Sequence, residues 1–88
     1  MRLDKWLWYA RFCKSRSLAQ SWILDGEVTL NGVPVAKASV VVKIGDRLEM
    51  PRGKRQRQRI LVLGVTDRRS DASAAALLYE GPVVVETL

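Results

Sequence analysis

Apolar residues recur at helical spacing in the first twelve positions of the chain. They form one stripe, which consists of Leu3, Trp6, Leu7 and Ala10. This period, with Lys5 and Arg11 off the stripe, predicts an amphipathic helix over residues 2–12 that has a basic edge. Trp8 also lies off the stripe. Four placements remain open for it: solvent, packing under the following loop, stacking on an RNA base, or packing against the next helix, which we favour.

A second apolar stripe follows a polar break at residues 14–17. It consists of Leu18, Ala19, Trp22 and Ile23 and predicts a second helix. Gly26 is expected to end that helix, because glycine readily adopts the left-handed conformation. Either Ser15 or Ser17 can cap its N-terminus, and Ser17 together with Gln20 fits a capping box.

The middle of the chain alternates between apolar and polar residues, as half-buried strands do. The predicted strands cover residues 27–30, 33–35, 47–50 and 56–65. Asn31-Gly32 predicts a tight hairpin turn between the first two strands. Pro34 restricts the second strand to an edge or a short return, because proline cannot donate a hydrogen bond to the ladder.

Charge adds the first indication of a partner. The chain has 15 Lys and Arg against 9 Asp and Glu, a net charge of +6 and a pI near 10.1. Residues 1–25 carry +3 and residues 51–69 carry +6, whereas residues 26–50 are neutral and residues 70–88 carry −3. Two basic blocks favour a polyanionic partner. Charge alone does not separate RNA from DNA or from anionic lipid.

The residue types exclude several kinds of chemistry. A chain of 88 residues has room for one domain. With Cys13 as the only cysteine and no histidine, neither a disulfide within the chain nor a zinc site can form, and Cys13 is expected to be a small buried hydrophobe. There is no glycine-rich phosphate loop and no obvious carboxylate pair. We therefore expect a binding protein that is not an enzyme and uses no cofactor or small-molecule substrate.

Hydropathy indicates the compartment. No apolar run approaches the roughly 20 residues that span a membrane, and no secretory signal is recognisable. We therefore expect a cytoplasmic protein of bacterial type that has no membrane partner.

Residues 11–16, which we call the corner, join the two predicted helices. Arg11, Lys14 and Arg16 stand there beside the amides that open the second helix. A helix N-terminus carries partial positive charge and free N–H groups, so it is a natural phosphate site. The alternative is that these three cations are merely solvated.

The spacing of these residues resembles the α-L RNA-binding motif. A small-subunit ribosomal protein shares this domain with bacterial tyrosyl-tRNA synthetases and many pseudouridine synthases. The resemblance spans roughly residues 2–50. It rests on Arg2-Leu3-Asp4-Lys5, Leu7, Arg11, Ser15-Arg16, Ala19, Ile23, Gly26, Val28, Asn31-Gly32, Lys37, Ser39 and Gly45-Asp46.

A closer resemblance, to the heat-shock protein 15 family, covers nearly the whole chain. It rests on Arg2-Leu3-Asp4-Lys5-Trp6-Leu7-Trp8, Ala10-Arg11-Phe12, Arg69, Ala72-Ser73, Ala75-Ala76 and Leu78-Tyr79-Glu80. The resemblance implies an α+β fold in which two N-terminal helices pack on a small antiparallel sheet and a short C-terminal helix follows. We expect residues 1–66 to form the RNA-binding domain and residues 67–88 to form a short helical extension packed on it.

The same resemblance implies a function. Members of that family bind RNA and the free large ribosomal subunit, and are associated with rescue of subunits that still carry a nascent chain on tRNA. We therefore expect a monomer that binds ribosomal RNA of the large subunit, and tRNA on it, after stress. Two alternatives remain: an accessory RNA-binding subunit of an RNA-modifying enzyme, and a general nucleic-acid binder that also accepts DNA.

The motif positions indicate which side chains meet RNA. These are Arg2, Lys5, Arg11, Lys14, Ser15, Arg16, Gln20 and Lys37. Three have alternatives, since Arg2 could pair with Asp4, and capping alone would explain Ser15 and Gln20. Asp4 itself is expected to cap the first helix or to orient a nearby cation. Secondary contacts are expected from Lys54, Arg55 and Arg57, whose alternative is a flexible, solvated loop.

Overall fold

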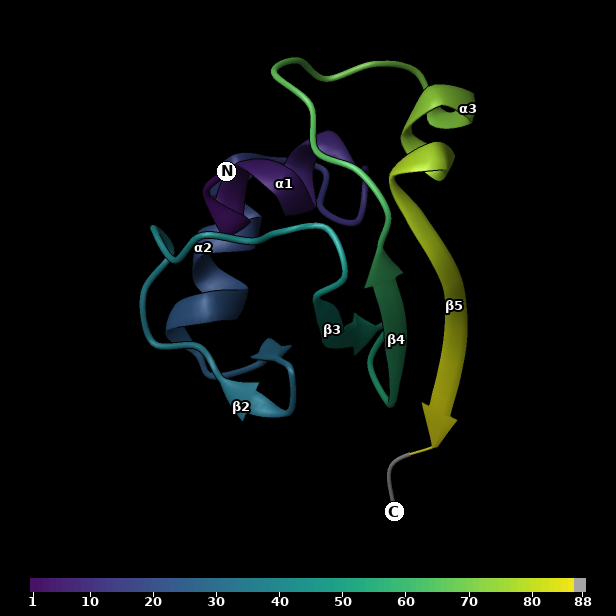
Figure 1. The fold of residues 1–88 in the computed structure, drawn as a ribbon. Helices are drawn as coiled ribbons and strands as arrows, with labels where there is room; N and C mark the ends of the chain where they lie inside the picture. The colour runs from purple at the N-terminus through teal and green to yellow at the C-terminus, as the bar shows by residue number, and fades with distance from the viewer. Residues whose placement is uncertain (87–88) are drawn as a thin grey trace.

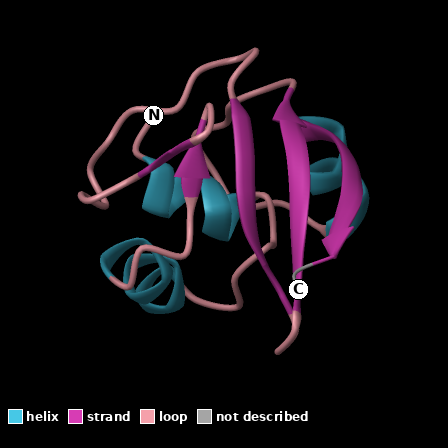
Figure 2. Ribbon diagram, turned by 90° about the horizontal axis from the view of Figure 1, so that it is seen from below, coloured by secondary structure: helices cyan, strands magenta, loops and turns pink. Residues whose placement is uncertain are grey.

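The computed structural model describes residues 1–86, of which Glu86 is described by its backbone alone. The helices pack on an antiparallel sheet in an α+β arrangement, which confirms the expected fold class (Figures 1 and 2). The elements are α1 (Leu3–Tyr9), α2 (Arg16–Leu24), β1 (Thr29–Leu30), β2 (Val33–Pro34), β3 (Arg47–Arg52), β4 (Gln56–Val62), α3 (Ala72–Ala75), the 3-10 turn η1 (Ala76–Leu78) and β5 (Tyr79–Glu86).

Helix α1 is shorter than the helix predicted over residues 2–12. Arg11 has a φ of 66°, and this left-handed residue prevents the helix from continuing. The amides of Phe12 and Cys13 then both donate to the carbonyl oxygen of Leu7, at 3.0 and 3.3 Å. The chain thus closes back on α1 before it turns into α2.

Helix α2 begins at Arg16, because Ser15 is its N-cap. The Oγ atom of Ser15 accepts a hydrogen bond from the amide of Leu18 at 3.1 Å. The predicted capping box of Ser17 and Gln20 is therefore wrong. The helix ends where the sequence indicated, since Gly26 follows it with a φ of 74°.

The sheet has five antiparallel strands in the order β2-β1-β3-β4-β5. Asn31 and Gly32 have φ values of 52° and 87°, as the predicted tight turn between β1 and β2 requires. Strand β5 was not predicted. Its Val83–Val85 run is short and does not alternate in polarity, so it carries no period-two signal.

The C-terminal segment is consequently not a purely helical extension. A short helical stretch, α3 followed by η1, leads into β5, which pairs along the length of β4. The division of the chain at residue 66 stays a prediction.

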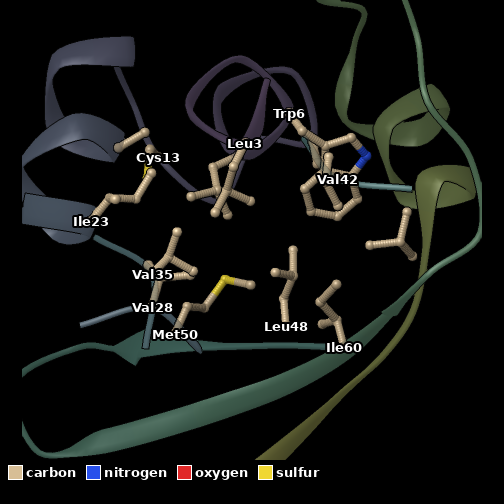
Figure 3. Close-up of a cluster of buried hydrophobic side chains, with 14 residues drawn as sticks. Leu3, Trp6, Cys13, Ile23, Val28, Val35, Val42, Leu48, Met50 and Ile60 are labelled. Atoms are coloured by element: carbon tan, nitrogen blue, oxygen red, sulfur yellow. The ribbon is translucent and has the colours of Figure 1, made fainter. Parts of the chain in front are cut away.

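The core lies between the two N-terminal helices and the sheet (Figure 3). Its buried side chains are Leu3, Trp6, Leu7, Ala10, Cys13, Ala19, Ile23, Val28, Val35, Val42, Leu48, Met50, Ile60 and Val62. Alternation along β3 buries Leu48 and Met50 and leaves Arg47 on the outer face. Cys13 is 1% exposed, as expected of a small hydrophobe, and burial raises the pKa of its thiol to about 12.

Residues 63–71, which we call the strap, lead from β4 to α3 (Figure 1). The strap is joined to α1 by the fully buried Trp6, whose Nε1 atom donates to the carbonyl oxygen of Gly64 at 2.8 Å. Helix α1 is therefore tied to chain that is 58 residues distant in sequence. Among residues 1–86, no helix has the length and apolar character that crossing a membrane requires.

Candidate nucleic-acid interface

Asp4 is the organising side chain of the predicted RNA-binding residues. Its carboxylate is fully buried and accepts five hydrogen bonds. The donors are Arg2 Nε and Nη2 at 3.1 Å each, the Lys5 amide at 2.9 Å, Arg16 Nε at 3.1 Å and Gln20 Nε2 at 3.0 Å. The side chains of three predicted contact residues, Arg2 before α1 and Arg16 and Gln20 on α2, thus converge on one carboxylate. The expectation that Asp4 orients a nearby cation is confirmed.

The ionised form of Asp4 is strongly favoured. Burial by itself raises the pKa of the carboxyl group, but hydrogen bonds from Gln20, Arg2, Arg16 and the Lys5 amide outweigh burial and lower the pKa from 3.8 to about 2. Asp4 is therefore a fixed negative charge at neutral pH. A buried charge of this kind is tolerated only because several donors compensate for it.

The two arginines keep donors for a ligand. Arg16 contacts Asp4 through Nε, which leaves its two Nη groups, and Arg2 uses Nε and Nη2, which leaves Nη1. Their side chains are 45% exposed for Arg2 and 35% exposed for Arg16. The carboxylate therefore holds two guanidinium groups in fixed directions at the protein surface, an arrangement suited to a phosphate group.

The start of α2 adds backbone donors beside these arginines. Ser15 satisfies the amide of Leu18, whereas the structure gives the amides of Arg16 and Ser17 no partner within residues 1–86. Ser15 thus acts in the structure as a cap, which was the alternative to an RNA contact. The free amides, the helix dipole and the Arg16 guanidinium group would each attract an anion to this point.

Lys37 lies in the loop between β2 and β3, and hydrogen bonds join the backbone of this loop to the start of α1. The amide of Leu3 donates to Val40 at 2.8 Å, and that of Asp4 donates to Ala38 at 3.3 Å. The backbone next to Lys37 is thereby tied to the first turn of α1, and the Lys37 side chain is exposed. Lys5, in that same turn, is half-buried.

Arg11 and Lys14 are exposed, but they do not join the Asp4 cluster. The Nε atom of Arg11 donates instead to the carbonyl oxygen of Ser70 in the strap, at 2.7 Å. The corner therefore has two parts: the Asp4 cluster at its α2 side, and Arg11 against the strap at its α1 side.

The secondary basic block lies elsewhere. Lys54 and Arg55 stand in the β3–β4 turn and line an open hollow of about 420 Å³ together with Trp22 and Asp25, near the C-terminal end of α2. Arg57 is 21% exposed and pairs with Glu27 and Glu49, so its charge is engaged within the protein. The structure does not bring this block to the corner, which lies at the opposite end of α2.

Sequence reasoning missed one arginine beside the corner. Arg69 of the strap donates from Nε to the carbonyl oxygen of Trp8 at 3.1 Å, and its guanidinium carbon lies 5.6 Å from the centre of the Trp8 ring. No local pattern could indicate this contact, because the two residues are 61 positions apart. Among residues 1–86, no three His, Cys, Asp or Glu side chains gather to form a metal site.

The chain is similar in sequence to known proteins and to one protein family. The S4 domain family matches residues 1–48. Heat shock protein 15 of Escherichia coli (strain K12) is 45% identical over 80 residues, which cover 91% of this chain and 59% of that protein. The chain thus spans less than two thirds of the length of that relative. The RQC P-site tRNA stabilizing factor of Halalkalibacterium halodurans is 39% identical over 82 residues. These residues cover 91% of this chain and 88% of that protein.

The fold agrees with these matches. The trimeric structure of Vibrio cholerae Heat Shock Protein 15 superimposes with a TM-score of 0.86 at 40% identity and covers 94% of this chain and 81% of that one. The part that matches the S4 domain family, residues 1–48, contains Asp4 and the side chains that donate to it. The chain belongs to the S4 domain family and, within it, to the heat shock protein 15 family.

Proposed function

We propose that this protein binds structured RNA through the surface around Asp4, and that it acts by binding alone, without catalysis. The proposal rests on one observation: the guanidinium groups of Arg2 and Arg16 are both held by one buried carboxylate, that of Asp4, beside the N-terminus of α2. In this proposal Lys5 of α1, Lys14 of the corner and Lys37 of the β2–β3 loop supply further phosphate contacts, and Gln20 completes the cluster. Phosphate contacts position a protein without reading sequence, so RNA shape sets the preference.

The cellular target in this proposal is ribosomal RNA on the free large subunit, with tRNA beside it, in the cytoplasm. Two kinds of relative support it: one is named a heat shock protein, and the other is named a P-site tRNA stabilizing factor of ribosome quality control. The protein would then act in rescue or recycling of stalled subunits after stress. Sedimentation of the tagged protein through a sucrose gradient tests this, because recovery only among free proteins would exclude the ribosomal target.

RNA binding itself is tested by affinity for a labelled structured RNA at several salt concentrations. Neutralising five phosphates should make log affinity fall with log salt at a slope of about −3.5 to −4.5. Duplex DNA of matched length, added as competitor at the same salt, separates the proposal from a general nucleic-acid binder. Equal competition by DNA would favour that alternative, and a pull-down that returned an RNA-modifying enzyme would favour an accessory subunit.

We propose that one chain suffices for this contact, since the hydrogen bonds that orient Arg2, Arg16 and Gln20 on Asp4 need no second chain to form. The solved relative from Vibrio cholerae is trimeric. Light scattering on the protein with and without RNA measures the mass of the complex. A complex that forms only as a trimer would contradict binding by a single chain.

A further inference from the structure

Two arginines, one from each side, hold the strap against the end of α1. Arg11 donates to the carbonyl oxygen of Ser70 at 2.7 Å, and Arg69 donates to that of Trp8 at 3.1 Å. The Trp8 carbonyl belongs to the last turn of a helix, which carries partial negative charge, so a cation is stabilised there. The strap thus lies directly against the α1 side of the corner.

This junction also contains aromatic rings. The guanidinium carbon of Arg69 lies 5.6 Å from the centre of the Trp8 ring, within the range of a cation–π contact. The Tyr9 ring adjoins Trp8 with a centroid distance of 5.4 Å. Trp8 and Tyr9 are both half-buried, whereas Arg69 is exposed. The guanidinium group therefore lies over an indole, while the Arg69 side chain is exposed to solvent.

The charge of Arg69 is not neutralised by its neighbours. Asp67 and Asp71 stand close in sequence, but within residues 1–86 neither forms an ion pair with Arg69, and Asp71 caps α3 by accepting a hydrogen bond from the amide of Ala74 at 2.8 Å. Among the described residues, 1–86, Arg11 likewise finds a partner only for its Nε group. Both arginines keep Nη groups that can donate to a ligand.

We propose that Arg69, seated on Trp8, is a stacking site for one unpaired base of the RNA that the corner binds. Unpaired bases in RNA stack on aromatic rings and on guanidinium planes, and Arg69 presents an exposed guanidinium group over the half-buried Trp8 ring. The Nη groups of Arg11 hold the phosphate next to that base. The inference rests on the proposed RNA-binding function and adds the kind of RNA: a structured element with an unpaired nucleotide beside its helix.

Two conservative variants of the full chain form a matched pair. Arg69→Lys keeps the charge and a donor for the Trp8 carbonyl but removes the plane on which a base stacks. Arg68→Lys makes the same change at the neighbouring exposed arginine, for which the structure gives no ring contact. The probes are an RNA hairpin with an unpaired loop and a fully paired RNA of equal length, at equal salt. Melting temperatures of both variants are recorded.

The expected result is a loss of about tenfold in affinity for the looped RNA in Arg69→Lys, with the affinity for paired RNA and the salt slope unchanged. Arg68→Lys should change neither affinity. An equal loss for both RNAs, or no loss in folded Arg69→Lys, would overturn the stacking site and leave the proposed function standing. Failure of the wild-type chain to bind either RNA would overturn both.

A second measurement needs no variant. 2-Aminopurine, a base whose fluorescence is quenched by stacking, is placed in turn at each position of the hairpin loop. One position should be quenched when the wild-type protein binds, beyond the quenching in the free RNA. Binding without added quenching at any loop position would contradict the inference, whatever the stability of the variants.

Discussion

The Nε atom of Arg16 lies 3.1 Å from Oδ2 of Asp4, which joins the start of α2 to the first turn of α1 through a buried carboxylate. Oδ2 also accepts from Arg2 and Gln20. The direction of both guanidinium groups consequently depends on a single side chain, which also links α2 to α1. This relationship makes the charge of Asp4, although negative, part of a surface proposed to bind a polyanion.

Asp4→Asn should weaken RNA binding, even though it makes the protein more positive by one charge. The amide keeps the shape of the side chain but removes the charge that orients Arg2 and Arg16, so we expect a loss of about tenfold in affinity, or about 1.4 kcal/mol. Fluorescence anisotropy with a labelled structured RNA measures it. If net charge alone governed binding, the variant would bind more tightly, and that result would exclude the positioning role.

The stability of the fold should depend on pH through Asp4. The pKa of this group is lower in the folded chain, at about 2, than its ordinary value of 3.8. The ionised carboxylate therefore stabilises the fold fully above pH 3.8, and this stabilisation is lost as the pH falls toward 2. The shift corresponds to about 2 kcal/mol. Urea midpoints measured between about pH 5 and about pH 2 should fall more steeply for wild type than for Asp4→Asn. If the urea midpoints of the two proteins fell equally with pH, Asp4 would not be the group that causes the pH dependence.

Lys14→Gln combined with Lys37→Gln should flatten the salt dependence of RNA binding. Both side chains are exposed and neither forms an ion pair within residues 1–86, so we expect unchanged thermal stability. Loss of two phosphate contacts should reduce the magnitude of the slope by about 1.4 to 1.8. The control is Lys43→Gln with Arg47→Gln, which removes the same charge from exposed positions outside the proposed contact set. Equal slopes for the two double variants would remove Lys14 and Lys37 from the contact surface.

Arg57→Gln should affect the fold more than RNA binding. Arg57 donates to the Glu27 carbonyl oxygen at 2.7 Å and pairs with the carboxylates of Glu27 and Glu49, so its loss should cost about 1–2 kcal/mol of unfolding free energy. Lys54→Gln, at the exposed turn of the same hairpin, should leave stability unchanged. Urea denaturation and salt-dependent RNA binding are measured for both. A flatter salt slope with intact stability in Arg57→Gln would restore Arg57 to the RNA contacts.

Gly81→Ala should destabilise the pairing of β5 with β4. Gly81 has a φ of 112°, and an added Cβ would lie 3.1 Å from the carbonyl oxygen of Arg59, so we expect a cost above about 2 kcal/mol. Gly53→Ala is the control, because its φ of 63° is also left-handed but the space around it is open, and about 1 kcal/mol is expected there. Thermal melts compare the two. Equal costs would show that the backbone moves away from Arg59 without penalty.

Local patterns were sufficient for most of the fold and for one part of the site. The stripe that contains Leu3 and Trp6, the alternation along β3 and the Asn31-Gly32 turn each depend on neighbours in sequence, and the structure agrees with all of them. Strand β5 lacks such a pattern, because its stability comes from pairing with β4. For Asp4 the sequence left two roles open, capping the first helix or orienting a nearby cation, and the structure shows that it pairs with Arg2 and Arg16. Which donors reach Asp4 depends on how α1 meets α2, and that angle is set by packing.

The buried hydrogen bond from Trp6 to Gly64 has a consequence for observing this molecule in solution. An indole proton held in this way exchanges with deuterium only when α1 and the strap separate. The half-buried indoles of Trp8 and Trp22 have no such bond within residues 1–86 and should exchange faster. Three indole signals in a proton spectrum therefore report separately on the opening of the fold, through Trp6, and on the surface beside the corner, through Trp8.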